Sequence, residues 1–192
     1  MNSSLFRKEV MPFMTMFGLL IVTTVIVDVV LHQFKLVWVG RWLGIPGVIL
    51  IVLSFLYSMR KRNLIQFGKP KSLLTLHEAL TWTGALMILI HGGIHIYTLL
   101  PWIALFFMLI NIISGMTGTY LLRRSRLFIA NKKTLISDAK LSELEKNERL
   151  FWDATTFELM KKWRTIHLPI TFSFVALAIA HVLSVFVFWE WK

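Results

Sequence analysis

The sequence predicts an all-α integral membrane protein, a helical bundle with about five transmembrane helices. Hydrophobic residues make up 56% of the 192-residue chain and the mean hydropathy is +0.68, whereas soluble domains are roughly 45–50% apolar. Several apolar runs are long enough to cross a bilayer, which takes about 20 helical residues. The basic residues behind the net charge of +11 collect between alternate runs, as expected of cytoplasmic loops.

Five apolar stretches are expected to span the membrane and to build a single membrane domain over residues 1–192. We place the spans at about residues 11–31, 43–59, 73–99, 101–122 and 166–189. The first resembles a secretory signal, but its apolar run is too long for one and no small-residue cleavage site follows it. We therefore expect it to remain as the first span.

The stretch over residues 123–164 is the only sizeable polar segment, and we expect it to be a cytoplasmic connector. Its leucines and Phe151 suggest an apolar stripe on a helix, so we expect it to lie on the membrane surface. Two interpretations stay open: a docking platform for a redox partner, or a solvated connector that pads the bundle.

Charge sets the expected orientation. Only three of the 21 lysines and arginines fall on the far side of the predicted spans: Lys35, Arg41 and Lys192. Because basic residues favour the cytoplasm, we expect the N-terminus inside and the C-terminus outside. Attraction to membrane lipid headgroups is expected at the basic face, and the charge is assigned to topology, not to nucleic acid. The bacterial inner membrane is the expected location.

One histidine spacing occurs twice. His77 and His91 enclose thirteen residues in the third expected span, and His167 and His181 enclose thirteen in the fifth. Fourteen steps make almost four helical turns, so each pair lies near one face, about 21 Å apart along the axis. In the predicted topology both helices run outward, which brings His77 level with His167 and His91 level with His181.

Two layers of paired imidazoles suit two stacked haems, each held by one histidine from each helix. A lone histidine in a span is often a hydrogen-bonding partner between helices, but four at matched spacing favour iron coordination. His95 lies one turn after His91 and is an alternative outer ligand. Arg164 at the inner face and Arg41 at the outer face are weaker candidates for binding haem propionates.

Other residues in these spans allow two interpretations each. Gly84, midway between His77 and His91, either admits a flat macrocycle or serves close helix packing. Phe174, midway between the other pair, favours plain packing over a place on an electron route. Asp28 marks a proton or quinone path, or a position near the surface. His32 is expected in the outer interface, with no partner visible in the sequence.

The chain contains no cysteine. This excludes disulfides, cysteine-ligated iron–sulfur clusters and covalent haem attachment through C-x-x-C-H. No residue set suggests a hydrolase or a transferase. The sequence therefore favours an electron-transfer membrane subunit of an oxidoreductase that holds two non-covalent b haems.

Paired H-x13-H motifs on two parallel helices resemble the membrane domain shared by ferric reductases and NADPH oxidases. The resemblance covers roughly residues 70–190 and rests on spacing. It implies His77 and His167 as ligands of an inner haem, His91 and His181 as ligands of an outer haem, and outward electron flow. We expect no flavin or nicotinamide domain after the fifth span. The donor would then be a partner subunit, a soluble reductase or membrane quinol, with an acceptor protein or small molecule outside.

Two other hypotheses remain open. The motifs also resemble the quinone-reactive cytochrome b subunits of larger respiratory complexes, including those of hydrogenases and formate dehydrogenases, which would add a quinone to the cofactors. A metal-ion transporter that uses histidine ligands is the remaining alternative. Against it, the two histidine layers are about 21 Å apart, and no acidic ligands accompany them in the spans.

Overall fold

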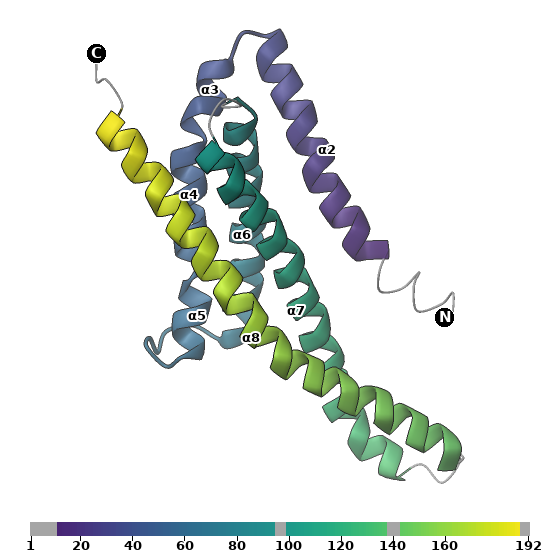
Figure 1. The fold of residues 1–192 in the computed structure, drawn as a ribbon. Helices are drawn as coiled ribbons and strands as arrows, with labels where there is room; N and C mark the ends of the chain where they lie inside the picture. The colour runs from purple at the N-terminus through teal and green to yellow at the C-terminus, as the bar shows by residue number, and fades with distance from the viewer. Residues whose placement is uncertain (1–10, 95–98, 138–142, 189–192) are drawn as a thin grey trace. The chain divides into compact units, whose positions relative to one another are not determined.

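The computed structural model describes residues 11–94, 99–137 and 143–188, and every element in this part of the chain is an α-helix (Figure 1). The helices are α2 (Met11–Gln33), α3 (Val37–Trp42), α4 (Gly44–Ser54), α5 (Leu56–Lys61), α6 (Pro70–Ile94), α7 (Leu99–Ser137) and α8 (Glu143–Phe188). The predicted all-α fold is confirmed.

Five stretches of the described chain are long and apolar enough to cross a membrane, as predicted. They are Met14–Gln33, Val37–Lys61, Pro70–Gly93, Leu99–Tyr120 and Glu158–Phe188. In the first two, only 11% of the most apolar window is buried inside the protein. Side chains such as Leu19, Ile26 and Val52 are more than half exposed, which suits a surface that faces lipid. The chain is therefore an integral membrane protein.

The second span begins at Val37, six residues before the predicted start at Leu43, and it is not one continuous helix. It consists of α3, α4 and α5, separated at Leu43 and Phe55. At each break the backbone forms a tighter i→i−3 bond: Leu43 N–H to Gly40 O at 3.2 Å, and Phe55 N–H to Val52 O at 3.1 Å. Pro46 contributes to the first break, because it has no N–H to give to the carbonyl four residues earlier.

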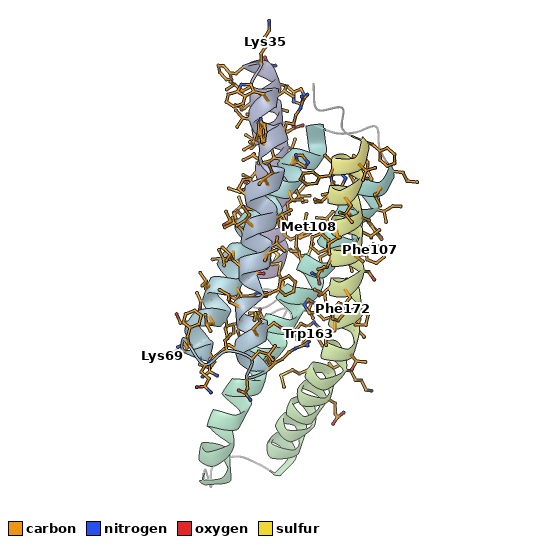
Figure 2. All side chains as sticks on the ribbon, turned by 90° about the vertical axis from the view of Figure 1, so that its left-hand side faces the viewer. Lys35, Lys69, Phe107, Met108, Trp163 and Phe172 are labelled. Atoms are coloured by element: carbon orange, nitrogen blue, oxygen red, sulfur yellow. The ribbon has the colours of Figure 1, made fainter. Side chains whose placement is uncertain are left out.

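The chain divides into two compact units, Met1–Met108 with Leu177–Lys192, and Leu109–Ala176. The expectation of a single domain stays a prediction. In the first unit α6 packs against α2, α3, α4 and α5, most extensively against α4. Figure 1 shows α3, α4 and α5 following one another along α6, and Lys35 and Lys69 lie towards opposite ends of this unit (Figure 2).

Two glycines make a close contact between α4 and α6. A Cβ atom on Gly84 would stand 2.9 Å from the carbonyl oxygen of Gly47, and one on Gly47 would stand 3.1 Å from the carbonyl oxygen of Gly84. No side chain fits between them. Of the two interpretations of Gly84, close helix packing is therefore what the structure shows.

The second unit consists of the adjoining parts of α7 and α8. The predicted connector over residues 123–164 is helical in the part that the structure describes, because α7 continues to Ser137 and α8 begins at Glu143. Its cytoplasmic location stays a prediction. No glycine or proline occurs between Gly118 and Pro169, so no helix-breaking residue interrupts α7 after Gly118 or α8 before Pro169. Pro169 lies inside α8.

Candidate functional site

The two predicted ligands on α6 both bind the second span through the backbone. His77 Nδ1 donates to the carbonyl oxygen of Ser54 at 2.9 Å, and His91 Nδ1 donates to the carbonyl oxygen of Arg41 at 2.9 Å. Ser54 is the last residue of α4, and Arg41 lies in the last turn of α3. The last four carbonyls of a helix have no partner within it. The two helix breaks therefore supply one acceptor for each histidine.

These hydrogen bonds define the protonation of both rings. A carbonyl oxygen can only accept, so each Nδ1 carries the proton, and the neutral ring then has its lone pair on Nε2. A histidine that ligates metal through one nitrogen commonly donates its other N–H to a backbone carbonyl or a carboxylate, which fixes tautomer and ring orientation. His77 and His91 thus have the tautomer and the orienting bond that a metal ligand needs.

His91 lies against the backbone at the first helix break. A Cβ atom on Gly44 would stand 3.0 Å from Cγ, Cδ2 and Nε2 of the imidazole, so glycine at this position makes room for the ring. The second neighbour of the His91 ring is His181 on α8. The two ring centres are 6.5 Å apart, and the angle between the ring planes is 55°. The predicted outer pair is therefore brought together.

The distance between these two rings can be compared with that in a metal complex. A metal–imidazole bond is about 2.0 Å, and a five-membered ring with bonds of about 1.35 Å places its nitrogens about 1.15 Å from its centre. Two imidazoles on opposite sides of one metal ion therefore have ring centres about 6.3 Å apart. The 6.5 Å between His91 and His181 is close to this distance, and it also lies within the range of about 4.5–7 Å for ordinary ring packing. Rotation of either ring about its metal–nitrogen bond permits any angle between the planes.

His77 lies at the second helix break, among aromatic and polar neighbours. The ring of Tyr57 in α5 is 5.6 Å from that of His77, at an angle of 36°, and Lys61 Nζ lies 5.6 Å from the centre of the Tyr57 ring. Thr81 Oγ1 donates to the His77 carbonyl oxygen at 2.7 Å. Ser54, whose carbonyl binds the imidazole, is only 2% exposed, and its hydroxyl donates to Ile51 O at 2.6 Å.

His167 lies in the second unit, with partners on α7. Its Nδ1 is 2.9 Å from Ser114 Oγ, and the indole of Trp163 stacks on its ring at 4.8 Å and 22°. Thr171 Oγ1 donates to the His167 carbonyl oxygen at 2.9 Å and to Asn111 Oδ1 at 2.8 Å. His77 and His167 belong to different units, so their pairing stays a prediction.

The remaining predicted site residues have mixed outcomes. His95 lies outside the described residues, as does the side chain of Arg164. Arg41 is exposed and its backbone binds His91, which places it beside the predicted outer pair. Phe174 is 6% exposed, which fits the packing role. In the described part of the chain, no three His, Asp or Glu side chains come close enough together to hold a metal ion.

Asp28 and His32 line a cleft of about 540 Å³ between α2 and α6, together with Val29, Gln33 and Gly93. His32 Nδ1 donates to the Asp28 carbonyl oxygen at 2.8 Å. Its 3.6 Å distance to Asp28 Oδ1 is too long for a hydrogen bond, and this buried oxygen has no hydrogen-bond partner among the described residues. Both proposed roles of Asp28 stay open.

The histidine spacing does not predict the neighbours Ser54, Ser114, Tyr57 and Trp163. Two sequence patterns indicate other parts of these surroundings and Ser114 itself. The motif H-x3-T occurs at both predicted inner ligands, as His77 with Thr81 and His167 with Thr171. Small and polar residues also recur at helical spacing on one face of α7: Asn111, Ser114, Gly115 and Gly118.

Comparison of the chain with models of protein families, with curated proteins and with solved structures found no match.

Proposed function

We propose that this chain is a di-haem b-type cytochrome that passes electrons across the membrane. The observation that carries the proposal is the outer pair, because the fold brings His91 and His181, ninety residues apart in the chain, to a ring-centre distance of 6.5 Å. The backbone hydrogen bonds at Nδ1 of His77 and His91 support it, since a metal-bound histidine commonly donates its other N–H to a backbone carbonyl in this way.

In this proposal His91 and His181 bind the outer haem, and His77 and His167 bind the inner haem. Haem iron supplies one-electron redox chemistry when bound. The residues of the chain hold the four imidazoles in orientation: Arg41 and Ser54 through backbone carbonyls, and Ser114 through its hydroxyl. The resemblance to the membrane domain of ferric reductases and NADPH oxidases supports the same ligand assignment.

We place the protein in the bacterial cell membrane, with the basic end of its spans in the cytoplasm. There the donor is a partner subunit, a soluble reductase or membrane quinol, and the acceptor is a protein or small molecule outside. The chain would then be the electron-transfer subunit of an oxidoreductase.

Ligand variants of the purified protein test the assignment. We expect His91→Ala and His181→Ala each to reduce the haem content from two to one per chain, with the same haem lost in both, because either change removes one of the two residues that would hold the outer haem. His32→Ala is the matched control, since this histidine binds Asp28 on α2, and it should retain both haems. Two haems in His91→Ala would contradict the assignment.

Electron transfer is tested in sealed liposomes that contain ferricyanide and the reconstituted protein. Dithionite added outside should reduce the enclosed ferricyanide only when the wild-type protein is present, because neither reagent crosses the bilayer. His91→Ala should slow the reaction strongly, and His32→Ala should not. Equal rates with and without protein would refute electron transfer across the membrane.

A further inference from the structure

Two complementary faces meet within the second unit. On α7, the face contains Asn111, Ser114 and Gly118, and on α8 it contains Trp163, His167 and Thr171, which follow one another at four-residue intervals. Such positions lie on one side of a helix. Asn111 binds Thr171, and Ser114 binds both Trp163 and His167. The polar groups of this contact hold the two helices together within the apolar membrane.

The indole of Trp163 is held from three directions. Its Nε1–H lies 2.7 Å from the carbonyl oxygen of Ser114 and 3.2 Å from Ser114 Oγ. Its ring stacks on the imidazole of His167. Its six-membered ring occupies the space above Gly118, where a Cβ atom would collide with Cζ2, Cε2 and Cη2. A residue with any side chain at 118 would therefore displace the indole.

This arrangement constrains the imidazole of His167 in two ways. The stacked indole, at 4.8 Å and 22°, restricts rotation of the imidazole plane. The indole N–H also holds Ser114, whose hydroxyl oxygen lies 2.9 Å from His167 Nδ1. In the tautomer that coordinates a metal through Nε2, Nδ1–H donates to this oxygen. The strength of that bond alters the basicity of a metal-bound imidazole.

We propose that Trp163 is a positioning residue that fixes the ring plane of His167 and the acceptor of its Nδ1–H, and so tunes the iron that His167 binds. The inference rests on the proposed function, because it takes His167 as a haem ligand. It adds a residue outside the histidine pattern, and it assigns Gly118 the role of leaving room for the indole.

Two variants separate the two effects of Trp163. Trp163→Phe keeps an aromatic ring that can stack on His167 but has no N–H for Ser114. Trp163→Leu removes both. Phe172→Leu is the matched control, because Phe172 lies on the same helix, is 65% exposed and is itself an aromatic residue (Figure 2). Ser114→Ala removes the hydroxyl that accepts from Nδ1 and leaves the indole in place.

The readouts are the electron paramagnetic resonance spectrum of the ferric protein and a redox titration of each haem. The g values of a low-spin haem with two imidazole ligands depend on the angle between the ligand planes, and the potential depends on hydrogen bonding to the ligands. We expect Trp163→Leu to shift the g values and the potential of one haem, and Trp163→Phe to shift the potential with g values close to wild type. We expect Ser114→Ala to raise that same potential, because a weaker bond at Nδ1 makes the imidazole a poorer donor.

The outcomes separate this inference from the function on which it rests. Wild-type protein that folds without haem overturns both. Wild-type protein with two haems, together with a Trp163→Leu variant whose g values and potentials equal those of Phe172→Leu, overturns the role of Trp163 alone. If Trp163→Leu does not fold, Trp163→Phe and Ser114→Ala still test the role of Trp163. Unchanged haem potentials in both variants would overturn the inference.

Discussion

Replacing Gly84 by alanine should push α6 away from α4, the helix that it contacts most. The new Cβ would stand 2.9 Å from the Gly47 carbonyl oxygen and 3.1 Å from Cγ1 of Ile51. The isoleucine side chain can rotate away, but the carbonyl belongs to the backbone of α4. The two helices must therefore separate by about 0.3–0.5 Å to bring this contact into the range of ordinary van der Waals distances.

The change in the free energy of unfolding caused by Gly84→Ala has two parts with opposite signs. Overpacking a tight contact costs about 1–3 kcal/mol, whereas alanine in a helix is more stable than glycine by about 0.5–1 kcal/mol. Separation also lengthens the bonds of His77 and His91 to the backbone of the second span, both now 2.9 Å. At about 3.2 Å or more these bonds begin to weaken. We expect a net loss of about 1–2 kcal/mol in the free energy of unfolding.

The measurement is reversible unfolding in mixed micelles, followed by the helical circular dichroism signal as the denaturing detergent fraction rises. Gly18→Ala is the matched control, because it makes the same change within α2 and a Cβ there meets no atom within 4 Å. The difference between the two variants cancels the helix preference and isolates the packing cost of about 1–3 kcal/mol. Equal stabilities of Gly84→Ala and Gly18→Ala would refute the close contact of α4 with α6.

Three further predictions concern Gly44, Asp28 and the membrane topology. Gly44→Ala should lower the haem content from two to one per chain by displacing the His91 ring, which a Cβ would meet at 3.0 Å; pyridine haemochrome counting checks this, and two haems would contradict it. Asp28→Leu should raise the stability by about 1 kcal/mol, because one oxygen of this part-buried carboxylate has no hydrogen-bond partner among the described residues and lies 3.6 Å from His32 Nδ1. A loss of stability in the micelle titration would contradict this. A reporter fused after Lys192 should show activity outside the cytoplasm and none inside it. Activity inside the cytoplasm would contradict the predicted topology.

The sequence was informative where apolar length or residue spacing encodes the structure. It predicted five spans, because a helix that crosses lipid needs a continuous apolar run. It also predicted that His91 and His181 come together, although they are ninety residues apart in the chain. The prediction came from the equal spacing of the two histidine pairs, because equal spacing on two parallel helices brings both pairs level.

The parts that were wrong or missing depend on backbone geometry. The predicted start of the second span at Leu43 was late, because the apolar run continues through Val37–Trp42. The acceptors of His77 and His91 are backbone carbonyls at helix ends, and a carbonyl has no residue signature. That α7 and α8 each extend beyond the apolar run into the predicted connector was not predicted, because polarity marks the end of a membrane span and not the end of a helix.

The central claim, that the four spaced histidines bind two haems, is tested most directly by the haem content of the purified protein. We would record the dithionite-reduced minus oxidised absorption spectrum and count haem per chain as the pyridine haemochrome. The account predicts a b-type spectrum and two haems per chain. Folded protein without haem would contradict it.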